Sequence, residues 1–355
     1  MTQVNLIIFG IGNVGATLIN QLIAFKAEVK QQQHIDLRIP VMANSKFVFF
    51  NSDDLNNTWI SAFDEFSVPY NISKIVDFVK NKYQNVIVVD ATASKCFVEN
   101  YEAFIKSGFH IAAANKVANT LDYDFYKTLR ETLKTKKKQF YYETNVGAGL
   151  PIIETVKTLQ VSGDKISKIR GVFSGSLSYI FNRFSEENVS FSDIVKDASK
   201  HGYTEPDVRD DLSGKDVARK LLILAREIGF QFNLEDVEVD SLVPSQLNGN
   251  TTLSEFNSRI TELDKSFQTQ KEQQTSDVLR YVGELDTETL KLKVSLVSEP
   301  KSTPLGQLKN ADNLFEIYSN GYQNQPLVIQ GAGAGKEVTA RGLFSDILKI
   351  AKVLQ

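Results

Sequence analysis

The chain has 355 residues, of which 42% are hydrophobic and 23% are charged. These values are typical of a folded protein long enough for two full hydrophobic cores, and they exclude a disordered or fibrous chain. The formal net charge is −3, and we interpret the short basic run 134–138 as a solvated helix end. Nucleic acid and anionic membranes are therefore not expected partners.

The amino terminus lacks the charged and apolar regions of a signal peptide, and no stretch approaches 18 uninterrupted apolar residues. We therefore expect a cytoplasmic enzyme. Cys96 is the only cysteine, which excludes an intrachain disulfide and a cysteine-based zinc site, and we expect it to be buried. The three histidines are too scattered in sequence to indicate a metal site.

The first motif joins a buried strand to a helix through a glycine-rich turn. An apolar run at 4–9 predicts the strand, and the helix should continue to about Lys30. In this context the glycines allow a tight turn and a close approach of backbone to a pyrophosphate. The predicted cofactor-binding residues of this turn are Gly10, Ile11, Gly12, Asn13, Val14 and Gly15.

The end of the next strand bears on the choice of cofactor. A strand at 34–43 is followed by Asn44, Ser45 and Lys46, with no acid. A carboxylate there would bond the ribose of NAD and repel a 2′-phosphate, whereas these three side chains can receive the phosphate. We therefore predict NADP as the cofactor, with NAD as the alternative.

Two further strands should bring polar residues to the same edge of the sheet. The strand at 86–89 runs into a segment where the nicotinamide half of the cofactor would pass, namely Asp90, Ala91, Thr92, Ala93 and Ser94. A helix at 97–107 and a strand at 110–113 follow. Lys116 then stands at the carboxyl end of that strand, over the predicted crevice, and is a further predicted cofactor-binding residue.

The pattern changes at residues 141–151, where a glycine-bearing turn precedes a helix at 152–159. Carbonyl groups in such a turn can face a monovalent cation or a ligand, and ordinary turn chemistry explains the composition equally well. A strand at 168–173 and a helix from Tyr179 follow.

The most polar segment, 199–226, combines a loop rich in acids with an amphipathic helix. Ser213 is the predicted N-cap, and Asp216 and Lys220 should project from one helix face. An isolated pair of this kind is usually a solvated ion pair. The density of carboxylates and basic groups here favours a site for a polar ligand.

The remaining segments predict a mixed sheet and a closing helix. Residues 245–275 read as irregular structure with a surface helix. Strands are expected at 279–284, 290–297, 315–318 and 327–330, with a tight Asn320-Gly321 hairpin turn between the last two. A second glycine loop, 331–336, opens an amphipathic helix at 337–354, and Gly333 is a further predicted cofactor contact.

These motifs together strongly resemble homoserine dehydrogenase, most closely the dehydrogenase part of bifunctional aspartokinase–homoserine dehydrogenases. The resemblance covers essentially the whole chain and is most specific in the segment Gly202–Lys220. It implies an α/β fold in which a Rossmann domain (1–140) is followed by an inserted α+β catalytic and dimerisation domain (141–325). Residues 326–355 would return to the Rossmann domain.

The activity implied is the reversible, NAD(P)-dependent interconversion of L-homoserine and L-aspartate 4-semialdehyde, in threonine, methionine and isoleucine biosynthesis. By similarity, Lys220 is the general acid/base and Lys116 and Asp216 are catalytic partners. Substrate would be bound by Lys116, Tyr203, Glu205, Asp211, Asp216 and Lys220. A sodium ion would be held by backbone carbonyls at Glu143, Val146, Ala148 and Leu150.

The resemblance also implies a homodimer formed through strands between about residues 150 and 330. The sequence starts at the Rossmann strand and ends at the cofactor helix, so we expect neither a kinase domain nor threonine control in cis. Residues 207–208 read Asp-Val where the family often has Asp-Pro, which should loosen that turn slightly. A dehydrogenase of a related amino-alcohol or semialdehyde, and a non-catalytic dinucleotide-binding regulator, are the alternatives.

Overall fold

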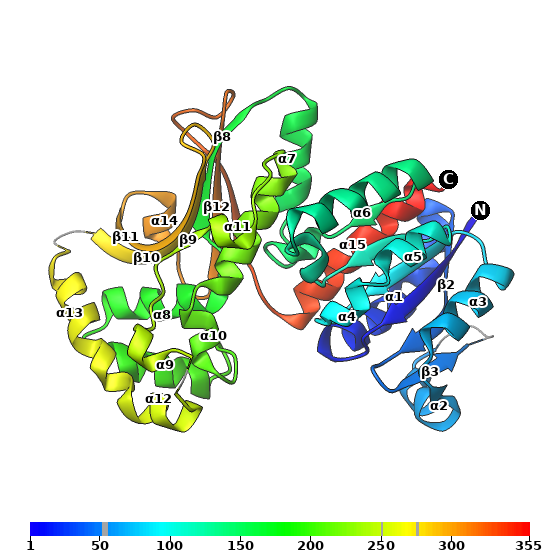
Figure 1. The fold of residues 1–355 in the computed structure, drawn as a ribbon, viewed down its shortest axis with the longest axis horizontal. Helices are drawn as coiled ribbons and strands as arrows, with labels where there is room; N and C mark the ends of the chain where they lie inside the picture. The colour runs from blue at the N-terminus through cyan, green and yellow to red at the C-terminus, as the bar shows by residue number, and fades with distance from the viewer. Residues whose placement is uncertain (52–55, 250, 275–276) are drawn as a thin grey trace. The chain divides into compact units, whose positions relative to one another are not determined.

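The computed structural model describes residues 1–51, 56–249, 251–274 and 277–355, which form two compact units (Figure 1). The first unit comprises Met1–Gly149 together with Gly335–Gln355, and the second comprises Leu150–Ala334. Within the described ranges, every helix falls short of the length and apolarity that a membrane crossing requires.

The first unit is built on a seven-stranded sheet in the order β4-β3-β2-β1-β5-β6-β7. Five of its strands are parallel, and β3 and β4 pair antiparallel at one edge. β1 and β5 are buried along most of their length, because helices cover both faces of the sheet. The strands are β1 (Thr2–Phe9), β2 (Ile35–Ala43), β3 (Phe47–Phe50), β4 (Val68–Pro69), β5 (Val86–Asp90), β6 (His110–Ala113) and β7 (Phe140–Tyr141).

The chain order around β1 creates the ligand-binding edge of this sheet. β1 has β2 as its neighbour on one side and β5 on the other, because the chain crosses to the other side of β1 after the first strands. The carboxyl ends of β1 and β5 therefore lie side by side at a switch point of the sheet. Phe9 pairs with Asp90 across this point. The predicted Rossmann-type fold is confirmed.

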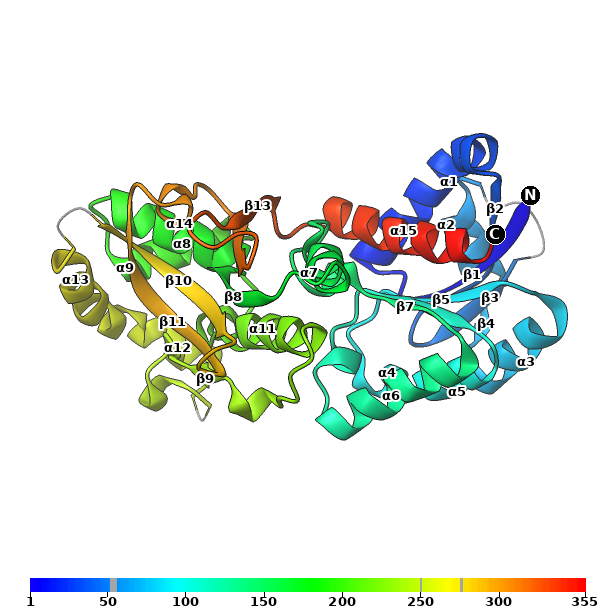
Figure 2. The same cartoon turned by 90° about the horizontal axis from the view of Figure 1, so that it is seen from above.

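Helices lie on both faces of the sheet, and Figure 2 shows α1 and α15 on one face and α3, α5 and α6 on the other. α15 packs against α1 and buries Leu343, Ile347 and Ile350, three of the apolar positions that predicted its inner face. The helices of this unit are α1 (Asn13–Gln33), α2 (Trp59–Phe66), α3 (Ile72–Lys82), α4 (Lys95–Val98), α5 (Tyr101–Lys106), α6 (Tyr123–Lys136) and α15 (Lys336–Val353).

Two predictions for the stretch after β5 are wrong. The expected single helix at 97–107 is two short helices, α4 and α5, because the chain turns at Glu99 and Asn100. Cys96 is exposed rather than buried. It occupies the solvent side of the first turn of α4, while Phe97 and Val98 supply the buried side.

The second unit contains a mixed six-stranded sheet in the order β13-β12-β8-β10-β11-β9. All neighbouring strands are antiparallel except β11 and β9. The predicted hairpin between β12 and β13 exists, but its connection is the segment 320–326 rather than a two-residue turn. The strands are β8 (Ile166–Val172), β9 (Glu238–Val239), β10 (Asp277–Asp286), β11 (Lys291–Pro300), β12 (Asp312–Ser319) and β13 (Leu327–Ala332).

The helices of the second unit pack on opposite faces of this sheet. α8 and α11 pack against β10, and α14 covers part of the other face, over a small core that contains Val172, Val282 and Leu314. The helices are α7 (Ile152–Val161), α8 (Gly175–Glu186), α9 (Phe191–Lys200), α10 (Val208–Leu212), α11 (Lys215–Glu227), α12 (Leu253–Arg259), α13 (Asp264–Glu272) and α14 (Pro304–Gln307). Short 3-10 turns are η1 (Val117–Asn119) and η2 (Glu143–Asn145) in the first unit, and η3 (Leu234–Asp236), η4 (Ser245–Leu247) and η5 (Ile260–Leu263) in the second.

The segment predicted as mostly irregular, 245–275, is largely helical in its described part. α12, η5 and α13 bury Phe256, Leu263 and Phe267, although most of their other positions are polar. Phe267 stacks on Phe191 of α9 with 3.8 Å between ring centroids. Tertiary burial of a few aromatic side chains therefore decides this structure, which local periodicity indicates only weakly. Residues 250 and 275 of this prediction lie outside the described residues.

Candidate active site

The turn between β1 and α1 is shaped for a close approach of a ligand to backbone. Gly10 has φ +89, and a Cβ on Gly15 would overlap the Gly10 carbonyl oxygen, so both positions require glycine. Gly12 has no atom within 4 Å of the place a Cβ would occupy, and no side chain caps α1. The start of this helix therefore has room beside Gly12 and no side-chain cap on its amide groups, as an anion-binding turn requires.

The three residues after β2 form a local turn. The Asn44 side-chain oxygen accepts hydrogen bonds from the backbone N–H groups of Lys46 (2.8 Å) and Phe47 (2.7 Å). Ser45 and Lys46 are exposed at the tip of this turn. A polar turn with an exposed ammonium group thus follows β2, where an NAD-selective site would carry an acid.

A buried carboxylate organises the loop after β5. Asp90 accepts hydrogen bonds from the Thr92 backbone N–H (2.8 Å), the Tyr101 hydroxyl (2.7 Å) and the Asn115 amide (3.0 Å). Burial raises the pKa of this carboxyl, while its hydrogen bonds oppose that shift. Because Asp90 ends a buried strand, its position at the switch point is visible in sequence, but its three donors are not.

Asn115 connects this loop to the turn that carries Lys116. Its amide nitrogen also donates to the Ser94 carbonyl (3.1 Å), and its oxygen accepts from the Val117 N–H (3.1 Å). Lys116 is half-buried and immediately precedes η1. The loop after β5 and the turn that carries Lys116 are therefore held by one network within the first unit.

In the second unit, the predicted helix-face pair is present in α11. Lys220 Nζ lies 2.8 Å from an Asp216 carboxylate oxygen and donates to the Phe173 carbonyl at 2.7 Å. The Lys220 residue is only 8% exposed. A buried ammonium group is costly unless it is paired, so both oxygens matter for keeping it in place.

The predicted N-cap of this helix is wrong. Ser213 ends α10, and Gly214 is the N-cap of α11, with φ +71. The two helices follow each other so closely that the joint needs a left-handed residue, which glycine adopts without strain. Ser213 still accepts a long hydrogen bond from the Lys215 N–H, at 3.4 Å.

Asp211 fixes the acidic loop that precedes α11. One of its oxygens accepts from the Ser176 hydroxyl and the other from the backbone N–H of Glu205, both at 2.8 Å. Burial raises the pKa of Asp211, and the charges of Glu205 and Asp216 add to that rise. These contacts place Asp211, Glu205 and Asp216 within one negative cluster. Sequence reasoning missed Ser176, whose only signal was a place in a serine-glycine turn.

Tyr203 stands at the edge of the same loop and is 44% exposed. Its ring stacks on Tyr179 of α8, with 4.0 Å between centroids and an interplanar angle of 14°. Arg183 donates to the Tyr179 hydroxyl at 3.0 Å and also pairs with Asp197. The loop carrying Glu205 is thus attached to α8 by an aromatic stack.

The turn predicted to hold a cation contains η2 and two residues with positive φ, Gly147 and Ala148. Glu143 is buried, and its backbone N–H donates to Asp346 of α15 at 2.9 Å. Val146 is also buried, whereas Leu150 begins the second unit. Among the described residues, no cluster of acidic, histidine or cysteine side chains has metal-binding geometry. This finding does not test the predicted cation site, because its ligands would be backbone carbonyls.

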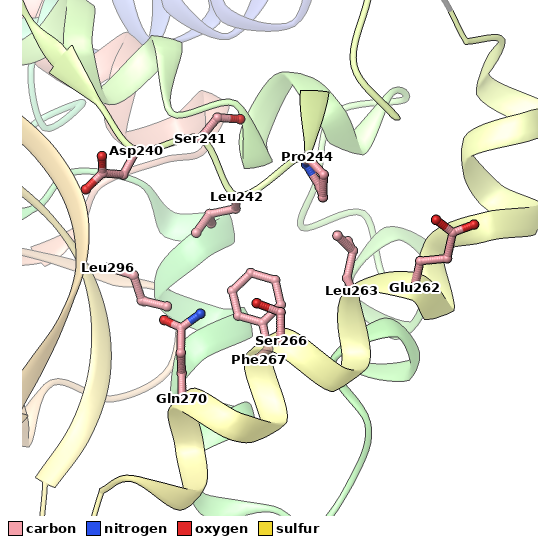
Figure 3. A pocket seen from close by; sticks show the side chains of 10 residues that line it. All are labelled: Asp240, Ser241, Leu242, Pro244, Glu262, Leu263, Ser266, Phe267, Gln270 and Leu296. Atoms are coloured by element: carbon pink, nitrogen blue, oxygen red, sulfur yellow. The ribbon is translucent and has the colours of Figure 1, made fainter. Parts of the chain in front are cut away.

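The second unit contains a cavity of about 280 Å³ (Figure 3). Its wall includes Leu242, Leu263, Phe267 and Leu296, and none of the predicted substrate-binding residues lines it. The backbone N–H of Leu242 donates to the Leu212 carbonyl at 2.9 Å. The cavity therefore borders a segment that supports the acidic loop, but it is not the candidate active site.

The chain matches two family models. One is described as homoserine dehydrogenase, over residues 151–348, and the other as the NAD-binding domain of homoserine dehydrogenase, over residues 10–143. Together they cover both units.

Curated relatives agree with these models. A homoserine dehydrogenase of Schizosaccharomyces pombe is 36% identical over 98% of this chain and 96% of its own length. A bifunctional aspartokinase/homoserine dehydrogenase of Zea mays is 40% identical over 98% of this chain but 38% of its own length. The chain thus spans less than half the length of the bifunctional relative.

Solved structures share the fold over nearly the whole chain. A crystal structure of a Candida auris protein of unknown function has a TM-score of 0.91 and 36% identity, covering 99% of both chains. A hyperthermophilic archaeal homoserine dehydrogenase in complex with NADPH has a TM-score of 0.75 and 22% identity, covering 100% of this chain and 99% of its own. With both family models and a nearly full-length relative in agreement, the chain belongs to the homoserine dehydrogenase family of NAD(P)-dependent oxidoreductases.

Proposed function

We propose that this protein interconverts L-homoserine and L-aspartate 4-semialdehyde with a nicotinamide cofactor. The observation that carries the proposal is the buried Lys220 ammonium group, paired at 2.8 Å with Asp216, whose charge acts on Asp211 together with that of Glu205. A zwitterionic substrate needs carboxylates for its ammonium group and a proton-transfer group for its hydroxyl. This cluster contains both.

Oxidation of the alcohol removes a hydride from carbon and a proton from oxygen. The nicotinamide ring accepts the hydride when the cofactor is bound. Lys220 as the neutral amine takes the hydroxyl proton, and in the reverse direction its ammonium group returns that proton to the aldehyde oxygen. Asp216 orients Lys220 and balances its charge. Lys116, in the first unit, is the second cationic group that we assign to the substrate.

Substitution of Lys220 by alanine should lower kcat by about 10² to 10⁴-fold and leave cofactor affinity nearly unchanged. Asp216→Ala should also be impaired, because it removes the partner of the ammonium group. Lys215→Ala is the matched control, because this exposed lysine precedes Asp216 by one residue and points about 100° away from it around the helix. Steady-state absorbance kinetics and NADPH titration measure both quantities. If Lys220→Ala kept near-normal turnover while Lys116→Ala abolished it, the proton transfer would belong to Lys116.

We also propose that NADP(H) is preferred over NAD(H). The support is the exposed ammonium group of Lys46 in a turn without an acid, where a 2′-phosphate would be attracted. The Asn44 oxygen accepts the hydrogen bonds of the turn itself, so the Asn44 amide nitrogen, Ser45 and Lys46 are the groups that can donate to the phosphate.

Lys46→Glu should therefore raise KM for NADPH by about tenfold, because a charged hydrogen bond to the 2′-phosphate, worth ~1.5 kcal/mol or more, is replaced by repulsion. KM for NADH should change little, because NADH lacks this phosphate. Lys74→Glu, an exposed lysine on α3, controls for net charge. Specificity constants for both cofactors decide the question. A wild-type preference for NADH would contradict the proposal.

A monovalent cation, sodium by resemblance, is proposed at the turn 143–150. The support is the chain reversal at Gly147 and Ala148, which brings successive carbonyl groups into one turn. The backbone carbonyls of Glu143, Val146, Ala148 and Leu150 would hold the ion. Its charge would hold the carbonyl groups of this turn in one arrangement.

Replacement of sodium by choline at constant ionic strength should lower the midpoint of thermal unfolding by a few degrees and reduce turnover, because a ligand that binds only the folded state stabilises it. Calorimetry and kinetics in sodium, potassium and choline chloride test this expectation. Equal values in sodium and choline would rule out a functional cation.

We propose a homodimer that forms through the face of the second sheet carrying α14. Beyond that helix, this face shows an ion-paired patch in which Arg170 lies 3.3 Å from Glu284 and 3.8 Å from Glu316. Lys168 lies over the ring of Tyr318, 4.9 Å from its centroid. Paired charges beside an aromatic side chain are the composition expected of a sheet face that a second subunit covers.

Sedimentation equilibrium should give twice the chain mass of 39.8 kDa. Tyr318→Ala should weaken this association at least tenfold, because the ring that covers Lys168 is lost. Tyr322→Ala, in the exposed connection 320–326, serves as the control. An active monomer over the whole concentration range would refute the proposal.

A further inference from the structure

The Phe173 carbonyl, which accepts from Lys220, is shared with a second buried donor. The side-chain nitrogen of Asn313 donates to this oxygen at 3.0 Å, while Lys220 Nζ donates at 2.7 Å. Val172 pairs with Leu314 in the β8–β12 ladder, so Phe173 stands opposite Asn313 just beyond it. The two donors account for both lone pairs of the carbonyl.

Asn313 is held firmly in this place. It is fully buried, and a Cβ on Gly333 would overlap its amide group, so Gly333 is needed here for close packing. The neighbouring ring of Phe173 packs edge-on against Phe315, with 4.8 Å between centroids. The amide therefore has little freedom to turn, and the opposite orientation would place its oxygen against the Phe173 oxygen.

The oxygen of the same amide has an unusual environment. Asn313 Oδ1 accepts no hydrogen bond from any part of the chain that the structure describes. A buried acceptor without a partner is unfavourable, and such groups are rare in folded proteins. Structural packing alone does not explain why an asparagine stands here.

We propose that Asn313 is a positioning residue for the proton transfer by Lys220, acting through the Phe173 carbonyl. An ammonium group has three N–H bonds. The Phe173 carbonyl and the Asp216 carboxylate take two of them, which directs the third towards the reacting oxygen of the substrate. Asn313 fixes the carbonyl through its side-chain nitrogen. This role rests on the proposed function.

The isosteric variant Asn313→Asp tests the inference, because it replaces the donor to Phe173 by an oxygen. Its kcat should fall about 10- to 100-fold, since a displacement of about 1 Å in a catalytic group costs up to that much. Affinity for NADPH should remain within about twofold of wild type. Asn313→Ala, which removes the donor without adding a charge, should show the same selective loss in kcat.

Asn182→Asp is the matched control. Asn182 is also buried, its nitrogen donates to the Asn310 carbonyl at 2.9 Å, and its oxygen likewise has no partner among the described residues. The carbonyl that it contacts is not shared with Lys220. Equal kcat values for Asn182→Asp and both Asn313 variants would overturn the positioning role, whereas the selective loss at Asn313 would support it.

A second measurement separates this inference from the proposed function. Wild-type turnover of homoserine is measured first, and its absence would refute the proposed function alone. The side-chain Nζ resonance of Lys220 in protein labelled with ¹⁵N-lysine, identified by NMR through its loss in Lys220→Arg, then reports the local geometry without catalysis. This resonance should shift in Asn313→Ala and Asn313→Asp but not in Asn182→Asp. An unchanged resonance in both Asn313 variants would overturn the inference whatever the activity.

Discussion

The buried ammonium group of Lys220 is the interaction on which the candidate site depends. A charge at 8% exposure is tolerable only with paired oxygens, here a carboxylate of its own helix and the Phe173 carbonyl at the end of β8. The helix α11 supplies Asp216 by i,i+4 spacing, whereas the sheet supplies the carbonyl. The helix therefore balances the charge of the lysine, and the helix and the sheet together fix its position.

The nucleotide-binding unit uses a different constraint, the close approach of backbone. Parallel strands place the turn after β1 beside the loop after β5, and glycine keeps the turn free of side chains. Asp90 accepts hydrogen bonds from Tyr101 and Asn115. Asn115 also accepts a hydrogen bond from the turn that carries Lys116. A single buried carboxylate thus sets the geometry of two segments that lie far apart in sequence.

The acidic loop of the second unit depends on a buried charge and on contacts to backbone. Asp211 uses one oxygen to hold Ser176 and the other to hold the backbone of Glu205, so the loop is fixed by charge-assisted hydrogen bonds. The raised pKa of Asp211 reflects burial beside other carboxylates. The proposed binding of a substrate ammonium group would relieve this concentration of negative charge.

Local patterns in the sequence were sufficient for the Rossmann unit and for the Asp216–Lys220 pair, because both follow from periodicities of a few residues. The strand–glycine–helix motif and the i,i+4 spacing are short-range properties. The N-cap at Gly214 was missed because two helices join too closely for the usual serine cap. The exposure of Cys96 was missed because a single position does not reveal which side of a short helix is buried.

Only the tertiary structure decided which distant groups meet. The pairing of Asn313 with the carbonyl of Phe173 crosses 140 residues and depends on the register between β8 and β12. The helical state of 253–272 depends on aromatic burial against α9, which outweighs a weak local pattern. Sequence by itself determined the motifs and the family resemblance, because they reside in neighbouring residues. Hydrogen-bond partners and burial were decided by strand register and packing, which bring together residues without any recognisable spacing.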